Sequence, residues 1–300
     1  MRECNFKLFQ ITIMKKCAVL TMDNLENFGS YDHLLIQPMK NLNWHVDFIS
    51  WRKENIDWDM YLSVIIRSPW DYQDDPQAFL QVLSDIENSS ARLLNSLNIV
   101  KWNINKKYLQ ELEEKGIEIV PTYWLENFNY QLIQDYFLMF NTNQIVIKPT
   151  ISANADNTFW LKKESYNSDK SLLEKCLTNK QLMVQPFIPA VVEEGEYSLF
   201  YFADQYSHCI LKTPKSGDFR VQEEHGSSIK AVEPSQKLLD AGFAAVKAIP
   251  EKVLYARVDL VEFMGSYKVM EVELIEPSLY FNYDELSPER FAMAFDKWMK

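Results

Sequence analysis

Three carboxylates in the last fifty residues of the chain occupy positions at which they would bind a divalent cation. Asp259 lies in one segment that alternates apolar and charged residues, and Glu271 and Glu273 lie in a second such segment. This period of two predicts two half-buried strands. A turn centred on Gly265 would place Asp259 opposite Glu271, with Glu273 on the same face. The carboxylates would repel one another unless cations such as Mg²⁺ lie among them.

The same alternation places Arg257 beside these carboxylates. Arginine holds phosphates and carboxylates through two parallel hydrogen bonds. Alternatively, Arg257 forms an ion pair with Asp259 or Glu271. Two alternatives also remain for the hairpin: a solvated acidic sheet face, or a register shifted by one residue that turns Asp259 to the other side.

Three lysines are predicted at the ends of apolar strands: Lys106, Lys148 and Lys212. A lysine inside a buried strand is costly without a partner. One anionic ligand would supply a partner for all three, and a triphosphate is the obvious candidate. The alternative is that each lysine reaches solvent at its strand end.

The composition is that of a folded globular protein with a large core. The chain has 300 residues, of which 47% are hydrophobic and 14% aromatic, enough for two or three subdomains. A formal net charge of −11 argues against nucleic-acid and anionic-membrane partners. No apolar run is long enough to predict a transmembrane helix. The four cysteines have neither metal-type nor disulfide-type spacing, which favours a reduced, cytoplasmic setting.

The predicted helices and strands are arranged differently in the first 100 residues and in the rest of the chain. Strand-like runs at 16–21, 45–51 and 61–67 alternate with amphipathic stretches, including a helix at 74–87, which predicts a parallel α/β sheet. Beyond residue 100 the pattern is α+β. The predicted strands there are 117–120, 144–149, 182–187, 196–202 and 206–213, followed by the acidic hairpin. The predicted helices are 108–116, 128–139, 168–177, 235–248 and one from 288.

The order of the motifs resembles the ATP-grasp superfamily. In chain order they are Lys106, Val-Ile-Lys148-Pro, Val-Gln185-Pro-Phe-Ile, Gly195-Glu196, Lys212, Gly-Asp-Phe-Arg220, Arg257-Val-Asp259, Glu271-Val-Glu273 and Glu276-Pro277. Within the superfamily the chain is similar to glutathione-synthetase-like and D-cycloserine-ligase-like members, over roughly residues 100–280. The resemblance implies an α/β (α+β) ATP-grasp fold in which a parallel α/β domain precedes two α+β subdomains that clasp ATP. The predicted divisions are an extension (1–13), the N-terminal domain (14–100), a small subdomain (101–186) and a large subdomain (187–300).

The resemblance also implies which residues bind ATP. The nucleotide-binding set would be Lys106, Lys148, Gln185, Phe187, Glu193, Glu196 and Lys212. Lys106 and Lys148 would contact the phosphates. Phe187 would pack on adenine, whose edge would meet backbone groups of 184–187. Either Glu193 or Glu196 would take the ribose hydroxyls.

Metal and catalytic residues follow from the same resemblance. Asp259, Glu271 and Glu273 would bridge two Mg²⁺ ions, with Mn²⁺ as an alternative, to the β- and γ-phosphates. The third ligand in glutathione-synthetase-like proteins is often asparagine, so Glu273 adds a charge. Arg220 and Arg257 would hold the γ-phosphate and the developing acyl phosphate.

Two loops, two histidines and one arginine outside these sets also have predicted roles. Segment 222–228 resembles a loop that closes over the phosphates, and 150–155 a small-residue flap. His208 is predicted to be a packed structural histidine, whereas His225 lies in the closing loop. Arg67 follows a buried strand and either binds a substrate carboxylate or precedes aromatic residues that pack against the next domain.

The predicted activity is that of an ATP-dependent carboxylate–amine ligase. It would act through an acyl phosphate on a small amino-acid-like or peptide substrate, with small-molecule carboxylate and amine partners. Dimers and tetramers occur among relatives, so a homo-oligomer is compatible with the resemblance. The alternatives are a non-catalytic nucleotide-binding or regulatory protein of the same fold, and an ATP-grasp phosphotransferase with a different acceptor.

Overall fold

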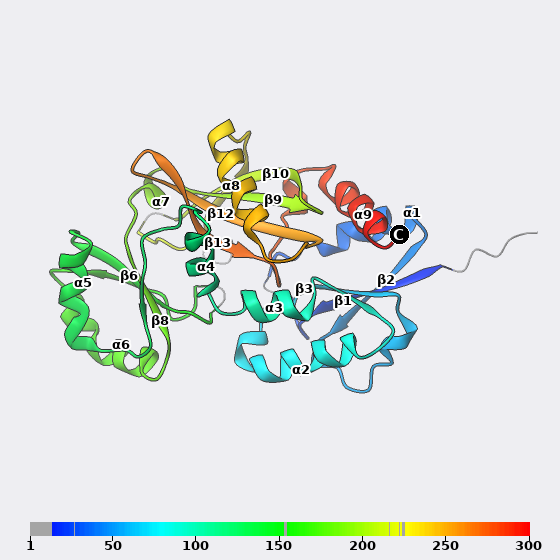
Figure 1. Cartoon of the computed structure of the whole chain (residues 1–300), viewed down its shortest axis with the longest axis horizontal. Coiled ribbons are helices and arrows are strands. Elements are labelled where there is room, and N and C mark those ends of the chain that lie inside the picture. Colours follow the sequence, from blue (N-terminus) through cyan, green and yellow to red (C-terminus); the bar gives the residue numbers. More distant parts are fainter. Residues whose placement is uncertain (1–13, 27, 153–154, 216, 222, 224–225) are drawn as a thin grey trace, which may run out of the picture.

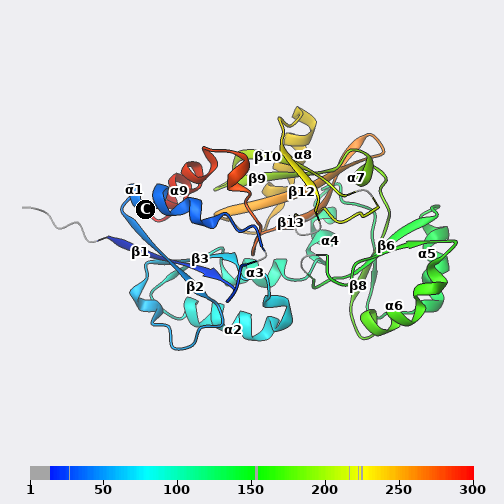
Figure 2. The ribbon, with the colours of Figure 1, turned by 180° about the vertical axis from the view of Figure 1, so that it is seen from behind.

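The computed structural model describes residues 14–26, 28–152, 155–215, 217–221, 223 and 226–300. The predicted extension, residues 1–13, lies outside this part of the chain. Three sheets are present. In both overall views the sheet of β6 and β8 and the N-terminal sheet of β1–β3 lie at opposite ends, with β12 and β13 between and above them (Figures 1 and 2).

The N-terminal sheet is parallel, as the alternation of strands and helices predicted. Its strands run in the order β2-β1-β3-β4 and are β1 (Lys15–Thr21), β2 (Trp44–Ser50), β3 (Ser63–Ser68) and β4 (Arg92–Leu94). Its helices are α1 (Ile36–Asn41), α2 (Pro76–Glu87) and α3 (Leu97–Asn103). Helix α2 begins after Asp75, whose carboxylate accepts the N–H of Ala78, with proline at the first helical position.

The second sheet is antiparallel and carries two helices. Its order is β5-β8-β6-β7, from β5 (Tyr123–Leu125), β6 (Gln144–Pro149), β7 (Phe159–Lys162) and β8 (Leu182–Pro186). Helices α5 (Ile133–Met139) and α6 (Lys170–Leu177) pack against it (Figure 1). Alternate residues of β6, Ile145 and Ile147, join this helix-covered core, so Val146 and Lys148 lie on the opposite face.

The third sheet is the largest, and a hydrophobic core packs against each of its faces. Its order is β11-β10-β9-β12-β13, from β9 (Glu196–Phe202), β10 (Gln205–Thr213), β11 (Ser228–Ala231), β12 (Tyr255–Phe263) and β13 (Ser266–Glu273). The remaining helices are α4 (Tyr108–Glu114), α7 (Ala190–Glu193), α8 (Gln236–Ala248) and α9 (Ser287–Trp298). Helices α4 and α8 share one core with Leu199 of β9, and α9 shares another with Phe200, the next residue.

The longer predicted elements are confirmed, and three details are wrong. Residues 117–120 form no named strand, only a single bridge from Ile119 to Val269. Lys106 is not at a strand end but between α3 and α4. Strands β4, β5, β7 and β11 and helices α1, α3 and α7 were not predicted, because elements of three to seven residues are too short to show a clear period. Within the described ranges, no helix combines the length and apolar character needed to cross a membrane.

Strand β13 ends the large sheet, and buried polar side chains bind its outer edge. Asn103 donates to the carbonyl of Val272 at 2.8 Å and accepts the N–H of Leu274 at 2.9 Å. The Tyr108 hydroxyl accepts the N–H of Val272 at 2.8 Å. Buried main-chain groups require such partners. This edge therefore fixes the part of β13 that carries the predicted metal ligands.

We expect Asn103→Leu to destabilise the protein. The substitution leaves the Val272 carbonyl and the Leu274 N–H without their partner, at a cost of about 1–3 kcal/mol for each group. Urea unfolding measures the loss. Asn98→Leu on the same helix is the matched control, because Asn98 is exposed. Equal stability of the two variants would contradict this account of the sheet edge.

Candidate active site

One face of the large sheet carries the charged residues that the sequence singled out. These residues alternate along four neighbouring strands: Glu196 and Ser198 (β9), Lys212 (β10), Arg257 and Asp259 (β12), and Glu271 and Glu273 (β13). The register pairs Asp259 with Glu271, which confirms the predicted hairpin register. It also pairs Arg257 with Glu273, Lys212 with Glu196, and Ser198 with Asp259.

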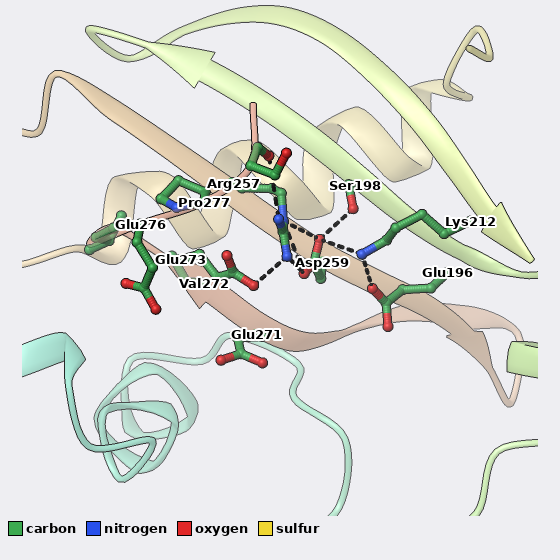
Figure 3. A network of polar contacts seen from close by, with 12 residues as sticks. Glu196, Ser198, Lys212, Arg257, Asp259, Glu271, Val272, Glu273, Glu276 and Pro277 are labelled. Carbon is green, nitrogen blue, oxygen red and sulfur yellow. Dashed lines mark hydrogen bonds and ion pairs between the residues drawn. The ribbon is translucent and has the colours of Figure 1, made fainter. Parts of the chain in front are cut away.

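Asp259 is the centre of a polar network on this face (Figure 3). Its carboxylate accepts the Ser198 hydroxyl and binds the Arg257 guanidinium, with an Nη2–Oδ2 distance of 2.9 Å. The Lys212 ammonium lies 3.5 Å from Asp259 and also binds Glu196. Arg257 extends from Asp259 to Glu273. The ion pair predicted as an alternative for Arg257 therefore exists with Asp259, and the second partner is Glu273 rather than Glu271.

Two of the three lysines do not reach solvent as the alternative interpretation proposed, whereas Lys148 is half-buried. Lys106 and Lys212 are buried, and Lys106 binds Glu271 at 2.8 Å and the carbonyl of Ser152 at 2.7 Å. Lys148 projects from β6 toward the cavity and forms no ion pair with any described residue. Burial lowers the pKa of Lys148. An anion would offset that cost, so Lys148 fits a phosphate best of the three.

The carboxylates differ in how readily they ionise. Burial is the largest effect on Asp259 and Glu271 and would raise the pKa of each. The surrounding groups together outweigh it, chiefly Arg257 and Lys212 at Asp259 and Lys106 and Lys148 at Glu271, so both pKa values are lowered. Burial raises the pKa of Glu273 to about 8. The charge of Arg257 would lower it, but the negative charges of Asp259 and Glu271 act against Arg257. Burial also raises the pKa of Glu276 to about 7. A metal ion would favour the charged form of these groups.

A cavity lies between this face and the second antiparallel sheet. It is lined by eleven of the twelve predicted site residues: Lys106, Lys148, Gln185, Phe187, Glu196, Lys212, Arg220, Arg257, Asp259, Glu271 and Glu273. The structure thus brings together cations from β6 and β10 and carboxylates from β12 and β13. Glu193 does not line the cavity and is exposed on α7, which leaves Glu196 as the member of that pair at the cavity wall.

The predicted metal ligands are paired with cations in this structure. Asp259 and Glu273 bind Arg257, and Glu271 binds Lys106. Accordingly, no three His, Cys, Asp or Glu side chains within the described ranges are arranged as a ready-made metal site. The chemistry of the donors still fits Mg²⁺, since all are carboxylate oxygens at one wall of the cavity. Binding of a metal requires these carboxylates to exchange partners.

The predicted adenine end is partly satisfied by protein contacts. The Phe187 ring stacks on Trp160, with centroids 4.2 Å apart and an interplanar angle of 13°. The Phe187 N–H donates to the Gln144 carbonyl at 2.9 Å, so this amide is not available to an adenine edge. Gln185 donates to the Thr122 hydroxyl at 2.9 Å. The aromatic surface at this end is therefore a pair of rings rather than Phe187 alone.

Arg220 and the two predicted loops are described only in part. The Arg220 guanidinium lines the cavity and binds Asp218, with an Nη2–Oδ2 distance of 2.7 Å. Much of the predicted closing loop, namely residues 222, 224 and 225, lies outside the described residues, and with it His225. The predicted flap at 150–155 includes residues 153 and 154, which also lie outside them.

Of the two alternatives given for Arg67, binding of a substrate carboxylate is contradicted by the structure. Its side chain is fully buried, binds Asp32 at 3.0 Å and donates to the Pro277 carbonyl at 2.8 Å. Trp70 and Tyr72, which follow it, do line the cavity. The segment after β3 therefore reaches the site through its aromatic residues, while the arginine supports the chain behind them.

His208 is a packed structural histidine, as predicted. Its ring stacks on Phe200 with centroids 4.2 Å apart, and Nε2 donates to the Leu279 carbonyl at 3.0 Å. It does not line the cavity. His208 therefore supports the sheet and is no part of the candidate site.

We expect the stability of the protein to depend on pH through His208. Burial lowers the pKa of His208 to about 4, from about 6.5 in an unfolded chain. The stabilisation by the neutral ring is complete above pH 6.5 and is lost as the pH falls toward 4, because the unfolded chain then binds the extra proton. The loss at pH 5 is about 2 kcal/mol. Urea unfolding at pH 7.5 and 5 should show this additional loss for the wild type compared with His208→Gln, and equal losses would exclude it.

Sequence reasoning missed several residues of the site. Ser198 could have been found, because it lies two residues after Glu196 on the same strand face. Asn103 shows no such signal, since it lies at the end of a short helix. Glu276 was part of a motif without a role, and Tyr280 was not considered. Both line the cavity.

Comparison with known proteins finds similarity over nearly the whole chain. The model of the N-terminal domain of D-cycloserine synthetase DcsG matches residues 17–95. The cycloserine biosynthesis protein DcsG of Streptomyces lavendulae is 24% identical over 278 residues, which cover 89% of this chain and 93% of that protein. The crystal structure of D-cycloserine synthetase DcsG superposes with a TM-score of 0.85 at 24% identity, over 95% of this chain and 100% of the other.

A further solved structure decides the fold. The ATP-grasp ligase PsnB, in complex with a phosphomimetic variant of its minimal precursor, Mg and ADP, superposes with a TM-score of 0.66 at 15% identity, over 96% of this chain and 100% of the other. This chain has the ATP-grasp fold. It is also a homologue of D-cycloserine synthetase. The ATP-grasp prediction drawn from the ordered motifs is therefore confirmed, and the cavity lies between its two antiparallel sheets.

Proposed function

We propose that this ATP-grasp protein is an ATP-dependent ligase that joins a carboxylate to an amine through an acyl phosphate. One observation carries the proposal: a single cavity gathers eleven of the twelve residues predicted for phosphate, metal and acyl-phosphate binding. They come from segments up to 167 positions apart, from Lys106 to Glu273. The homology to a synthetase and the likeness to an ATP-grasp ligase solved with Mg and ADP support the same reading.

The residues divide into roles along the cavity. Lys106 and Lys148 would hold phosphate oxygens of ATP. Lys148 is the better placed, because it forms no ion pair with the residues that the structure describes. Asp259, Glu271 and Glu273 would hold two Mg²⁺ ions, or Mn²⁺ in their place, which would neutralise charge on the transferred phosphoryl group. We propose two ions because Asp259 and Glu271 face each other while Glu273 lies two residues further along β13, opposite Arg257. Glu196 would contact the ribose or keep Lys212 in place.

The reaction follows from these positions. A substrate carboxylate oxygen attacks the γ-phosphorus of ATP, and the bond to ADP breaks. Arg257, anchored by Asp259 and Glu273, and Arg220 would stabilise the charge on the transferred group and then on the acyl phosphate. The amine nitrogen attacks the acyl carbon, loses a proton, and phosphate leaves. The protein contributes mainly positioning and charge, because ATP supplies the activation.

The first test is a thermal-shift assay of wild type and Glu271→Gln with a non-hydrolysable ATP analogue, with and without Mg²⁺. A ligand at about 100 times its Kd stabilises a fold by roughly 2.7 kcal/mol. We expect a Mg²⁺-dependent shift in the wild type that the variant loses. Hydroxylamine trapping of an acyl phosphate then separates a ligase from a phosphotransferase. An intact Mg²⁺-dependent shift in Glu271→Gln would remove Glu271 from the metal set.

We further propose a cytoplasmic location. Of the cysteines that the structure describes, Cys17, Cys176 and Cys209 are free thiols. Burial raises the pKa of Cys17 and of Cys209 to about 12, so these two are unreactive packed residues. A small-molecule carboxylate and amine remain the expected partners. Gel filtration with light scattering tests whether the chain forms a homo-oligomer.

A further inference from the structure

One end of the cavity is built from residues that have no role in the proposed phosphoryl transfer. Trp70 and Tyr72 follow β3 of the N-terminal sheet, and Glu276, Ser278 and Tyr280 follow β13. The two segments meet at the carboxyl end of a parallel strand, where open α/β sheets bind ligands. This end of the cavity is therefore where the substrate carboxylate or the attacking amine would bind.

The main chain around Glu276 is held by side chains of the N-terminal sheet. The Trp70 indole N–H donates to the Glu276 carbonyl at 2.8 Å. The Arg67 guanidinium donates to the next carbonyl, that of Pro277, also at 2.8 Å. Arg67 is itself fixed by its ion pair with the buried Asp32. The backbone that carries the Glu276 side chain is thus bound at two successive residues.

The Glu276 carboxylate has no cationic partner within the described part of the chain. The other carboxylates of this wall, Asp259, Glu271 and Glu273, all form ion pairs. Figure 3 shows the Glu276 carboxylate apart from Arg257, toward which Glu273 points. The cation that acts on Glu276 most strongly is Lys106, which is bound to Glu271.

Among the described residues, the side chain that hydrogen-bonds the Glu276 carboxylate is a neutral one. The Tyr72 hydroxyl makes this contact, and Tyr72 is itself buried. A partly buried carboxylate without a counter-charge costs free energy, which a positively charged ligand group would recover. Trp70 and Tyr72 line the same end of the cavity, and aromatic rings attract cations. The charge and the aromatic walls therefore favour the same kind of ligand group.

We propose that Glu276 binds the ammonium group of the substrate and so restricts the enzyme to amino-acid-like molecules. Glu276 is then a specificity residue on the phosphate side of the cavity, near Lys106. The inference rests on the proposed ligase function, since it assigns the substrate end of that same cavity. A hydroxyl in place of the ammonium group would leave the carboxylate without its counter-charge, which sites of this kind reject strongly.

The test compares an ammonium-bearing probe with its hydroxyl counterpart. Thermal shifts of the full chain are measured with ADP and Mg²⁺, and then with added D-alanine, D-cycloserine or D-lactate. The variants are Glu276→Gln and, as a matched control, Glu285→Gln, because Glu285 is exposed on the surface. We expect D-alanine or D-cycloserine to stabilise the wild type and the control. Glu276→Gln should bind that probe at least 10-fold more weakly, while D-lactate stabilises none of the proteins.

The nucleotide shift separates the two proposals. An unchanged ADP–Mg²⁺ shift in Glu276→Gln, with loss of the ammonium probe, supports the inference. Loss of the ADP–Mg²⁺ shift in that variant would place Glu276 in the nucleotide and metal site and overturn it. Equal binding of the ammonium probe by Glu276→Gln and wild type would overturn it too, as would no binding of either ammonium probe by the wild type. If the wild type shows no ADP–Mg²⁺ shift, the proposed function fails, and the same probes without nucleotide still test Glu276.

Discussion

Asp259→Asn is expected to lower the rate of ADP formation by about 10²–10³ fold, the cost of removing one preorganised charge-stabilising group. Asp259 is the residue on which Arg257, Lys212 and Ser198 converge. An amide keeps the size of the side chain and can still accept the Ser198 hydroxyl. It removes the charge that would bind a metal and hold two cations in place. Single-turnover ADP release under saturating ATP and Mg²⁺ measures the effect.

The fold should survive this substitution, because each cation keeps another partner. Arg257 remains bound to Glu273 and Lys212 to Glu196. The melting temperature checks this. Asp23→Asn is the matched control, since Asp23 is exposed. Ser198→Ala removes only one hydrogen bond and should cost less than about 10-fold, in keeping with about 1 kcal/mol for such a bond. A similar loss in the Ser198 and Asp259 variants would mean that geometry rather than charge decides the rate.

The charged face of the large sheet could be predicted because it depends on local sequence. Period-two alternation in β12 and β13, together with a short turn, determines which side chains share a face and which residues lie opposite each other. Asp259 and Glu271 were placed correctly from this pattern alone. The pattern offered the ion pair of Arg257 with Asp259 only as an alternative, and it did not reveal that Lys106 pairs with Glu271, because rotamers and the approach of Lys106 depend on the packed structure.

The substrate end could not be predicted because it depends on contacts between distant segments. The rule that ligands bind at strand ends pointed to Arg67. In the structure, however, Arg67 donates a hydrogen bond to the carbonyl of Pro277, which lies 210 residues later in the chain. The residues that remain open to the cavity, Trp70 and Tyr72, were treated as packing. Asn103 and Tyr108 hold β13 through equally distant contacts. Contacts between residues so far apart in the chain leave no periodic pattern in the sequence.

Arg67→Met is expected to destabilise the protein by about 3–5 kcal/mol, the usual cost of removing one partner from a buried ion pair. Arg67 and Asp32 are 0% and 1% exposed, so Asp32 would be left charged and buried, and among the described residues the Ser30 hydroxyl would remain as its hydrogen-bond donor. Urea unfolding gives the loss, and Arg67→Met/Asp32→Asn should recover part of it because the buried charge is gone. The exposed pair of Arg52 and Asp71 is the matched control, where Arg52→Met should cost less than about 1 kcal/mol. If Arg67→Met costs no more than Arg52→Met, the buried pair does not anchor the segment that carries Glu276.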